Sequence, residues 1–182
     1  MNSINNLNGM RTYLIGAMDR IPDGGIAWRE YITPYLKALN LSVLNPCNNP
    51  MFGIEENHNI RERIQHLKDM GRFDKIRIEY GNIRNADLRC VDISDFVICH
   101  VDMDVHMCGS YEEIVTANRQ KKPVLIWCKQ GKKNVPNWLF FMIPHEHIFN
   151  TIDDLLIFLH NINTSTDTRN LKRWFFLGEH KT

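Results

Sequence analysis

Two short stretches of the chain are apolar at nearly every position, DFVICHV at residues 95–101 and PVLIWC at residues 123–128. A strand that faces water on one side alternates apolar and polar residues, whereas a strand covered on both faces carries consecutive apolar residues. Both runs are far shorter than the ~20 residues that cross a bilayer. The chain is therefore expected to build a parallel sheet and to supply helices that cover both of its faces.

Three further runs, each bounded by turn or helix signals, predict more strands. They are TYLIGAM (12–18), LSVLNP (41–46) and HIFNT (147–151). Segments with helical periodicity lie between the strands, at residues 26–39, 85–93, 110–118 and 153–162. This alternation predicts an α/β fold that is flavodoxin-like and doubly wound, with a mainly parallel five-stranded sheet and helices on both faces. Ligands of such folds bind at the carboxyl ends of the strands.

The first predicted helix carries an apolar face and an internal proline. The apolar side chains are Trp28, Ile32, Tyr35, Leu36 and Leu39. Their spacing predicts that they pack together on the sheet, and Pro34 is expected to kink the helix.

Two segments depart from the alternation of strands and helices. Residues 47–82 are longer than a simple connection and include a helical pattern at 60–70, so we expect an insertion or lid there. The tail from residue 163 is polar and then reaches KRWFFLG at 172–178, whose aromatic side chains would be costly to leave in water. We expect this tail to dock, on its own domain or on another subunit. One domain over residues 1–182 suits a chain of this length.

Composition argues against several classes of partner. The 22 basic and 21 acidic residues give a net charge of +1, so no nucleic-acid polymer is expected as a partner. Five cysteines without CxxC spacing are expected to be reduced thiols. The first ten residues lack the features of a signal peptide, and no apolar run is long enough to span a membrane. We expect a cytoplasmic protein without a membrane segment.

The stretch MCGSYEEIVTAN at 107–118 combines a helix start with two glutamates. Ser110 followed three residues later by Glu113 matches a capping box, in which the serine and the glutamate each satisfy a backbone N–H. The same stretch follows the strand at 95–101, so it also places a carboxylate at the ligand edge of the sheet. Both interpretations stay open at this point.

Other polar residues are predicted to reach the same edge. Asp87 lies near the start of the helix that precedes the strand at 95–101, and Tyr13 and Gly16 lie on or just after the first strand. Asp95 instead begins its strand, at the opposite end of the sheet, where a structural role is expected. Three separate segments are thus expected to meet around one crevice.

The order of these motifs resembles that of the nucleoside 2-deoxyribosyltransferase-like family, which includes nucleotide N-glycoside hydrolases. The resemblance rests on YLIGAM near the start, Asn-Ala-Asp-Leu at 85–88, SDFVICHV at 94–101, and GSYEEIVTAN followed by KKPVLIW. The positions that match the last family motif are Gly109, Ser110, Glu113, Ala117, Lys122 and Val124. The likeness covers roughly residues 11–127, and it implies an enzyme that breaks an N-glycosidic bond.

The resemblance also assigns roles to individual residues. Glu113, and not its neighbour Glu112, would be the nucleophile that stabilises positive charge at the anomeric carbon and then forms a covalent glycosyl ester. Asp87 would recognise the base and deliver a proton to it. Tyr13 would orient the nucleophile through its hydroxyl, and Ala117 would keep the neighbouring helix face small enough for a sugar. No metal or other cofactor is implied.

The loop before the glutamates departs from the transferases. They commonly carry an aspartate six residues before the nucleophile to hold the sugar hydroxyls, and here that residue is Met107. Asp104 or Asp102 is the expected substitute. The loop at 102–108 also alternates residues that could bind a metal, but ligands normally come from separated segments, so we expect no metal there.

A phosphate on the substrate is a further option that the sequence leaves open. The hydrolases place small hydroxyl residues around a 5′-phosphate, and Ser110 at a helix start suits that role. Arg20 and the Gly24-Gly25 turn could add to the same pocket. The expected substrate-binding residues are Gly16, Arg20, Asp104, Gly109 and Ser110. Whether the sugar passes to another base or to water is not decided by the sequence.

Other functions were weighed against this one. An NAD glycohydrolase-like enzyme and a non-catalytic nucleotide-binding module remain alternatives, whereas a dinucleotide-dependent dehydrogenase is disfavoured because no GxGxxG opens the first helix. No serine or cysteine at an elbow motif partners the histidines, so His100, His106, His145 and His147 are expected to be surface or loop residues. The family resemblance implies a small-molecule nucleoside or nucleotide partner and a homo-oligomer.

Overall fold

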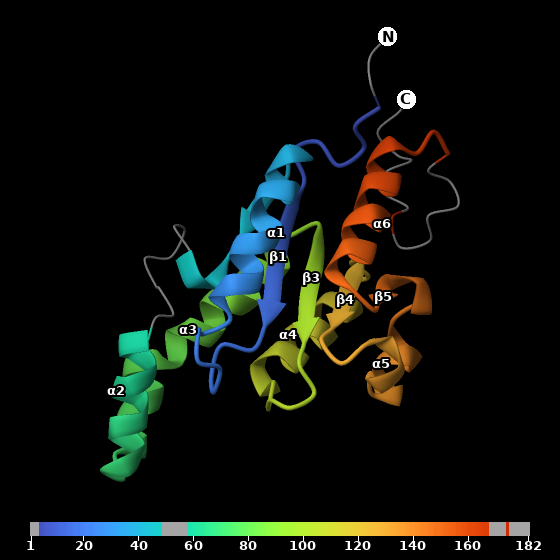
Figure 1. Ribbon diagram of the computed structural model, residues 1–182. Helices are drawn as coiled ribbons and strands as arrows, with labels where there is room; N and C mark the ends of the chain where they lie inside the picture. The colour runs from blue at the N-terminus through green and yellow to red at the C-terminus, as the bar shows by residue number, and fades with distance from the viewer. Residues whose placement is uncertain (1–3, 49–57, 168–173, 175–182) are drawn as a thin grey trace.

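The computed structural model describes residues 4–48, 58–167 and 174, and their strands form one sheet in the order β2-β1-β3-β4-β5. Every neighbouring pair of strands is parallel. The strands are β1 (Arg11–Gly16), β2 (Ser42–Leu44), β3 (Phe96–Val101), β4 (Val124–Cys128) and β5 (Ile148–Phe149). The α-helices are α1 (Ile26–Ala38), α2 (His58–Asp69), α3 (Phe73–Ile93), α4 (Cys108–Arg119), α5 (Asn137–Met142) and α6 (Ile152–Thr164). The predicted flavodoxin-like fold is confirmed (Figure 1).

Helices cover both faces of the sheet, as the consecutive apolar runs require. On one face Leu14 of β1 and Ile98 of β3 pack in a core that includes side chains of α1 and α6. On the other face Tyr13 and Val97, their direct sequence neighbours, pack in a core with side chains of α3 and α4. Because successive side chains of a strand point to opposite faces, each central strand contributes to both cores.

The parallel arrangement brings the carboxyl ends of the strands to a single edge. Gly16, the last residue of β1, pairs with His100 of β3, and His100 pairs with Trp127 of β4. The arrowheads of β1 and β3 in Figure 1 point to this edge. The loops that follow these strands therefore begin side by side, and the helices α1 and α4 begin just beyond them.

The insertion is largely a pair of helices, α2 and α3. The helix predicted at 85–93 is only the last part of α3, which begins at Phe73 and spans 21 residues. Asp87 consequently lies well inside a helix, and the prediction that it lies near the helix start is wrong. In Figure 1 α2 and the first half of α3 project from the body of the molecule. Residues 49–57 of the expected insertion lie outside the described residues, so its action as a lid stays a prediction.

Helix α1 runs through Pro34 and buries a different set of side chains from the predicted one. Trp28, Ile32 and Leu36 are buried as expected, but Tyr35 is 50% exposed. Arg29 takes a place on the buried face instead, with an exposed fraction of 0%. The spacing of Arg29, Ile32 and Leu36 is that of one helix face, and a pattern of apolar residues alone does not include Arg29.

The aromatic tail and two histidines pack inside the molecule. Trp174 is fully buried against Phe96, with ring centroids 5.0 Å apart, so this residue docks on its own chain. The rest of the expected docking segment lies outside the described residues. His100 and His147 are also buried, which corrects the prediction that they are surface or loop residues. No helix among the described residues is both long and apolar enough to cross a membrane.

Candidate functional site

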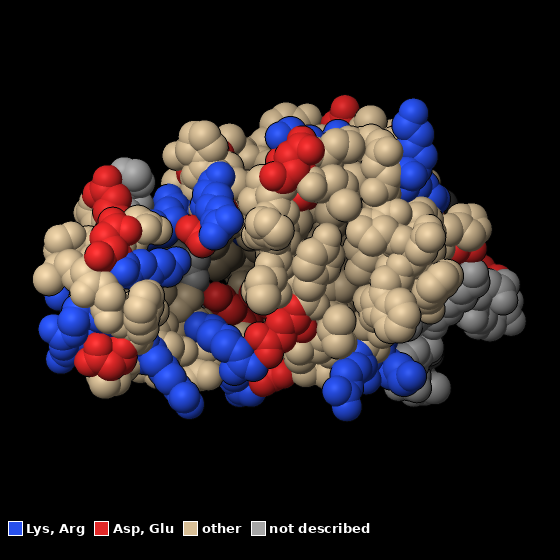
Figure 2. Space-filling model, turned by 90° about the horizontal axis from the view of Figure 1, so that it is seen from below, with Lys and Arg blue, Asp and Glu red and all other residues tan. Residues whose placement is uncertain are grey.

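A cavity of about 160 Å³ opens at the carboxyl edge of the sheet. Figure 2 views the molecule from this side and shows a hollow flanked by acidic and basic side chains. The predicted site residues that line the cavity are Tyr13, Gly16, Asp87, Gly109, Ser110 and Glu113. The cavity thus joins β1, α3 and α4, three segments that are far apart in the sequence.

The central contact of the cavity is a buried hydrogen bond between Tyr13 and Glu113. The Tyr13 hydroxyl donates to Oε1 of Glu113 over 2.8 Å. Tyr13 is held by its position in β1, and Glu113 lies in the second turn of α4 with an exposed fraction of only 8%. A hydrogen bond to a carboxylate in such a shielded place both orients the acid and stabilises its charged form.

Tyr13 is suited to donate this hydrogen bond at any physiological pH. Burial raises the pKa of its phenol well above 10, and the negative charges of Glu113 and Asp87 raise that pKa further. The hydroxyl therefore keeps its proton. The influence of Asp87 on Tyr13 also places the half-buried Asp87 carboxylate in the electrostatic surroundings of the Tyr13–Glu113 pair.

The neighbouring Glu112 faces a different environment. Its carboxylate accepts two hydrogen bonds from the guanidinium of Arg84 on α3, one of them of 2.8 Å from Nε. Both partners of this ion pair are largely exposed, with side-chain exposures of 60% for Arg84 and 42% for Glu112. Of the two adjacent glutamates, only Glu113 lines the cavity.

The start of α4 differs from the capping box predicted by the sequence. The helix begins at Cys108 after the N-cap residue Met107, and no side chain caps it. Ser110 is already the third helical residue, and Glu113 is hydrogen-bonded to Tyr13. The capping-box prediction is therefore wrong. The backbone N–H groups of the first helical turn, which have no acceptors within the helix, lie where Cys108, Gly109 and Ser110 line the cavity.

Ala117 was expected to leave room for a sugar beside Glu113, but it lies elsewhere. It lies one turn after Glu113 but is fully buried in the core between α4 and the sheet, and it does not line the cavity. Its small size serves the close approach of α4 to the strands.

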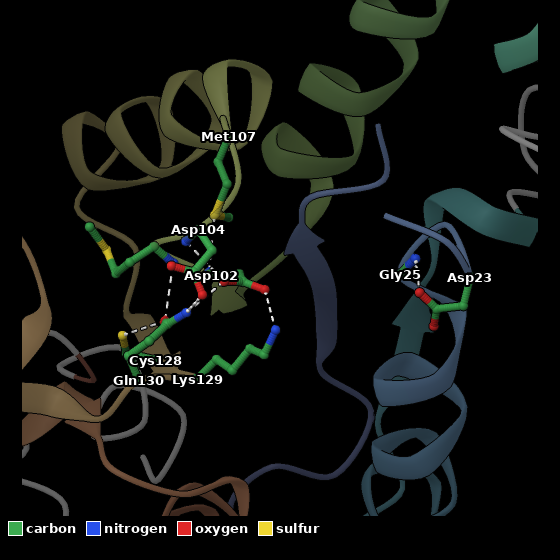
Figure 3. Close-up of polar contacts among 9 residues, drawn as sticks. Asp23, Gly25, Asp102, Asp104, Met107, Cys128, Lys129 and Gln130 are labelled. Carbon is green, nitrogen blue, oxygen red and sulfur yellow. Dashed lines mark hydrogen bonds and ion pairs between the residues drawn. The ribbon is translucent and has the colours of Figure 1, made fainter. Parts of the chain in front are cut away.

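The loop between β3 and α4 is tied to the end of β4 by a polar network. Asp102 is 5% exposed and accepts hydrogen bonds from Lys129 Nζ and from Gln130 Nε2, each of 2.7 Å. Gln130 also donates to Asp104 over 2.9 Å, and the backbone N–H of Asp102 donates to the Met107 sulfur (Figure 3). Asp104 is exposed and does not line the cavity, so its predicted contact with the sugar has no support from this arrangement.

Two of the possible metal ligands of this loop, Asp102 and Asp104, are engaged in this network. Burial alone would raise the pKa of Asp102, but the hydrogen bonds from Lys129 and Gln130 outweigh burial and lower that pKa to about 2. Within residues 4–48, 58–167 and 174, no group of three or more histidine, cysteine, aspartate or glutamate side chains is arranged to hold a metal ion.

The basic residue at the cavity is not the predicted one. Arg20 is exposed and does not line the cavity. Arg29, buried on α1, does line it, together with Met18 and Asp19 of the loop after β1. A charged residue on the otherwise apolar face of a predicted helix was the signal that could have identified Arg29 from the sequence.

Comparison with known proteins gives a result at the level of the fold. No protein-family model matches the chain, and no curated protein sequence matches it. Among solved structures, a 2-deoxyribosyltransferase from Bacillus psychrosaccharolyticus aligns with a TM-score of 0.54 and 13% sequence identity, over 80% of this chain and 90% of that one. The chain shares the fold of a 2-deoxyribosyltransferase.

Two further solved structures align with the 2-deoxyribosyltransferase fold of this chain. A 2-desoxiribosyltransferase from Leishmania mexicana has 17% identity and a TM-score of 0.46, over 94% of this chain and 99% of that one. A CMP N-glycosidase from Clostridium botulinum has 12% identity and a TM-score of 0.47, over 82% of this chain and 97% of that one.

Proposed function

We propose that the protein cleaves the N-glycosidic bond of a nucleoside or nucleoside 5′-monophosphate through a covalent glycosyl-glutamate at Glu113. The observation that carries this proposal is the 2.8 Å hydrogen bond from Tyr13 to Glu113 inside the cavity that Asp87 also lines. A carboxylate that is buried, oriented and shares a cavity with a second carboxyl group suits glycosyl transfer through a covalent intermediate. The 2-deoxyribosyltransferase fold of the chain agrees with this chemistry.

In the first step the Glu113 carboxylate attacks the anomeric carbon from one side while the bond from that carbon to the base nitrogen breaks. The electron pair of the broken bond stays on the base. Asp87, which takes up a proton from solvent before this step, gives that proton to the departing nitrogen. Tyr13 holds Glu113 during the attack. In the second step water or a second base attacks the glycosyl ester, returns a proton to Asp87 and releases the Glu113 carboxylate.

The test is a panel of ribo- and deoxyribonucleosides and their 5′-monophosphates, incubated with and without a free acceptor base while base release and exchange are followed by chromatography. We expect turnover of at least one member. Exchange that needs an acceptor identifies a transferase, and release without one identifies a hydrolase.

The covalent intermediate can be tested separately. A 2′-fluorinated substrate analogue slows hydrolysis of glycosyl esters, so we expect mass spectrometry to find its sugar attached to Glu113. NAD is included in the panel as the substrate of the alternative enzyme class. No turnover of any nucleoside, nucleotide or NAD would contradict the proposed function and favour a nucleotide-binding module.

A further inference from the structure

A second cavity, of about 340 Å³, lies between α2 and α3, where these helices project from the body of the molecule (Figure 1). We call it the α2–α3 groove. Its apolar lining residues are Ile60 and Ile64 of α2 and Ile76, Tyr80 and Ile83 of α3. All five side chains are only half-buried. The two helices therefore leave apolar surface accessible in the space between them.

The groove is held in shape at both ends. At one end Nη1 of Arg61 on α2 donates to the Met18 carbonyl, in the loop after β1, over 3.1 Å. A Cβ atom on Gly24, whose φ is 65°, would overlap the Arg61 guanidinium, so the loop has a glycine where the arginine passes. At the other end the chain turns at Gly71, whose φ is also 65° and whose N–H donates to the Lys68 carbonyl over 2.9 Å. The groove is thus preformed, as small-molecule sites usually are.

One residue of the lining is a glycine inside a helix. Gly81 lies in the middle of α3, where glycine is the least favourable residue apart from proline, because it loses the most backbone freedom. Packing does not require a glycine there. Among the described residues, a Cβ atom would come within 4 Å only of Arg77 Cγ, at 3.8 Å, which is an ordinary contact. The missing side chain instead leaves space in the groove for an occupant.

Charged side chains are distributed unevenly around the groove. The charged lining residues are four cations and one acid: Arg61, Lys68, Arg77, Arg84 and Asp19. Among the described residues of α2 and α3, no acidic side chain lines the groove. Glu79 instead forms an ion pair with Arg63 over 3.6 Å, and Asp74 forms one with Arg72 over 3.3 Å. The groove is therefore a cationic region of a chain whose net charge is only +1.

Two of the four cations are available to a ligand. Arg61 is held by the loop after β1, and Arg84 is held by Glu112. Lys68 and Arg77 are exposed, and within the described part of the chain neither side chain has an ion-pair partner. Apolar side chains beside such cations suit a ligand that joins an apolar body to an anionic group.

We propose that the α2–α3 groove binds a small organic anion, with an apolar body and one carboxylate or phosphate group. The body packs against Tyr80 and the isoleucines in the space that Gly81 leaves, and Lys68 and Arg77 bind the anionic group. The volume of about 340 Å³ lies in the range of about 300–1,000 Å³ that is usual for small-molecule sites. Asp19 lines both this groove and the proposed active cavity, so the occupant extends toward the active site from outside it.

The test measures the affinity of the full chain for naphthoate, naphthyl phosphate and the uncharged naphthamide by isothermal titration calorimetry. The three probes share one apolar body and differ in charge. We expect both anions to bind at a single site and naphthamide to bind about tenfold more weakly, the lower end of what hydrogen bonds to a charged group provide. The tighter of the two anions shows which anionic group the site prefers. Equal affinities for naphthoate and naphthamide would overturn the proposal.

Gly81→Ala separates the ligand site from the stability of the fold. Alanine favours the helix, so the thermal unfolding midpoint should rise, whereas the added methyl group should weaken naphthoate binding by at least about fivefold. Asn82→Ala, at the exposed neighbouring residue, is the matched control and should raise the midpoint without changing the affinity. An unchanged affinity in Gly81→Ala would place the probe outside the groove and overturn the proposal.

Replacing Lys68 and Arg77 together by glutamate tests the two cations. This double variant should weaken naphthoate binding by at least about tenfold and leave naphthamide binding nearly unchanged. Arg89→Glu, at an exposed arginine of α3 that lines neither cavity, should leave both affinities unchanged. Equal losses in the double variant and in Arg89→Glu would overturn the assignment of the anionic group to these cations.

A second copy of the chain is the alternative occupant of the groove, and analytical ultracentrifugation tests it. If the wild type bound no probe and formed a dimer that the double variant dissociated, the groove would be a contact between copies and the proposal would be overturned. None of these measurements needs turnover, so their outcome is independent of the proposed function.

Discussion

At the scale of single residues, two adjacent glutamates show how local environment decides chemistry. Glu113 is shielded in a cavity and hydrogen-bonded to a tyrosine that keeps its proton, whereas Glu112 forms an exposed ion pair with Arg84. Exposed ion pairs contribute only about 0–1 kcal/mol to stability, so Glu112 can be replaced without consequence for the fold. The chain thus provides its own control for the proposed nucleophile.

Replacing Glu113 by glutamine should abolish glycosidic cleavage while Glu112→Gln should not. Because the amide cannot form the glycosyl ester, we expect Glu113→Gln to lower kcat by at least about 10³-fold, the order seen when a covalent nucleophile is removed. Glu112→Gln should stay within about twofold of the wild type. Steady-state base release measures both. If Glu113→Gln kept full activity and Glu112→Gln lost it, Glu112 and not Glu113 would be the nucleophile.

Tyr13→Phe removes the hydroxyl that orients Glu113. We expect kcat to fall by about 10- to 10²-fold, somewhat less than the loss of one oxyanion-hole donor, because the carboxylate itself remains. Tyr35→Phe, on the exposed side of α1, is the control and should have wild-type kinetics. Equal kcat values for Tyr13→Phe and the wild type would show that the hydroxyl has no part in catalysis.

His100 should make the folded state sensitive to mild acid. Burial lowers the pKa of its imidazole from 6.5 to about 4, against the opposing influence of Asp102. The unfolded chain binds a proton at this residue below pH 6.5 and the folded chain does not, so stability falls as the pH drops from about 6.5 to 4. The free energy of unfolding falls by at most about 1.4 kcal/mol per pH unit through this residue.

Urea unfolding of the wild type and of His100→Phe between pH 7 and pH 4 measures this effect. The variant should have a flatter dependence of unfolding free energy on pH in that range. An unchanged slope in His100→Phe would show that another group is responsible.

At the scale of elements, the polar network at Asp102 fixes the loop that leads into α4. Asp102 connects this loop to Lys129 and Gln130 at the end of β4, so one carboxylate joins the segments after two neighbouring strands. The position of Glu113 depends on where α4 starts. The network is therefore expected to affect the proposed nucleophile through the backbone and not by contact.

Asp102→Asn should destabilise the fold by about 1–2 kcal/mol at pH 7, a value reduced by the exposure of Lys129. The folded pKa of Asp102 is lowered to about 2, so its contribution is complete above the ordinary value of 3.8 and is lost as the pH falls toward 2. The difference between wild type and variant should accordingly shrink between pH 4 and pH 2 in denaturant titrations. Asp104→Asn, at the exposed end of the network, should cost less, and an equal cost would contradict the central role of Asp102.

The elements also show what could be predicted from the sequence. The strands were predictable because burial on both faces leaves uninterrupted apolar runs such as residues 124–128. The start of α3 was missed because its first half carries exposed apolar residues such as Phe73 and Ile78 and lacks a clear apolar stripe.

In the proposed site, contacts between residues far apart in the sequence could not be predicted. A capping box was predicted from the spacing of Ser110 and Glu113, but the partner of Glu113 is Tyr13, 100 residues away in the chain. Arg29 was missed for another reason. Its acceptors are backbone carbonyl groups of Leu14, Gly16 and Gly25, which leave no trace in the side-chain pattern, so only its place on an otherwise apolar helix face could have indicated its burial.

At the scale of the whole molecule, the aromatic residue Trp174 extends the core beyond the last helix. It packs against Phe96, and its indole N–H donates to His147 Nε2 over 3.4 Å. Trp174→Ala should lower the free energy of unfolding by about 3–5 kcal/mol, because it leaves a cavity in the core. Trp138→Ala, at a tryptophan that is 69% exposed, should cost less than about 0.5 kcal/mol. Chemical denaturation checks both, and equal costs would mean that the tail contributes nothing to the core.

The two outermost strands are the shortest of the sheet, with three residues in β2 and two in β5. An exposed strand edge is a template on which other chains can add β-structure, and short edge strands are one of the ways in which proteins prevent such growth. The six-residue strands β1 and β3 lie inside the sheet, where both of their edges are already paired. Self-association of this protein is therefore expected to proceed through helices and loops, and aggregation through sheet extension should be slow even at high protein concentration.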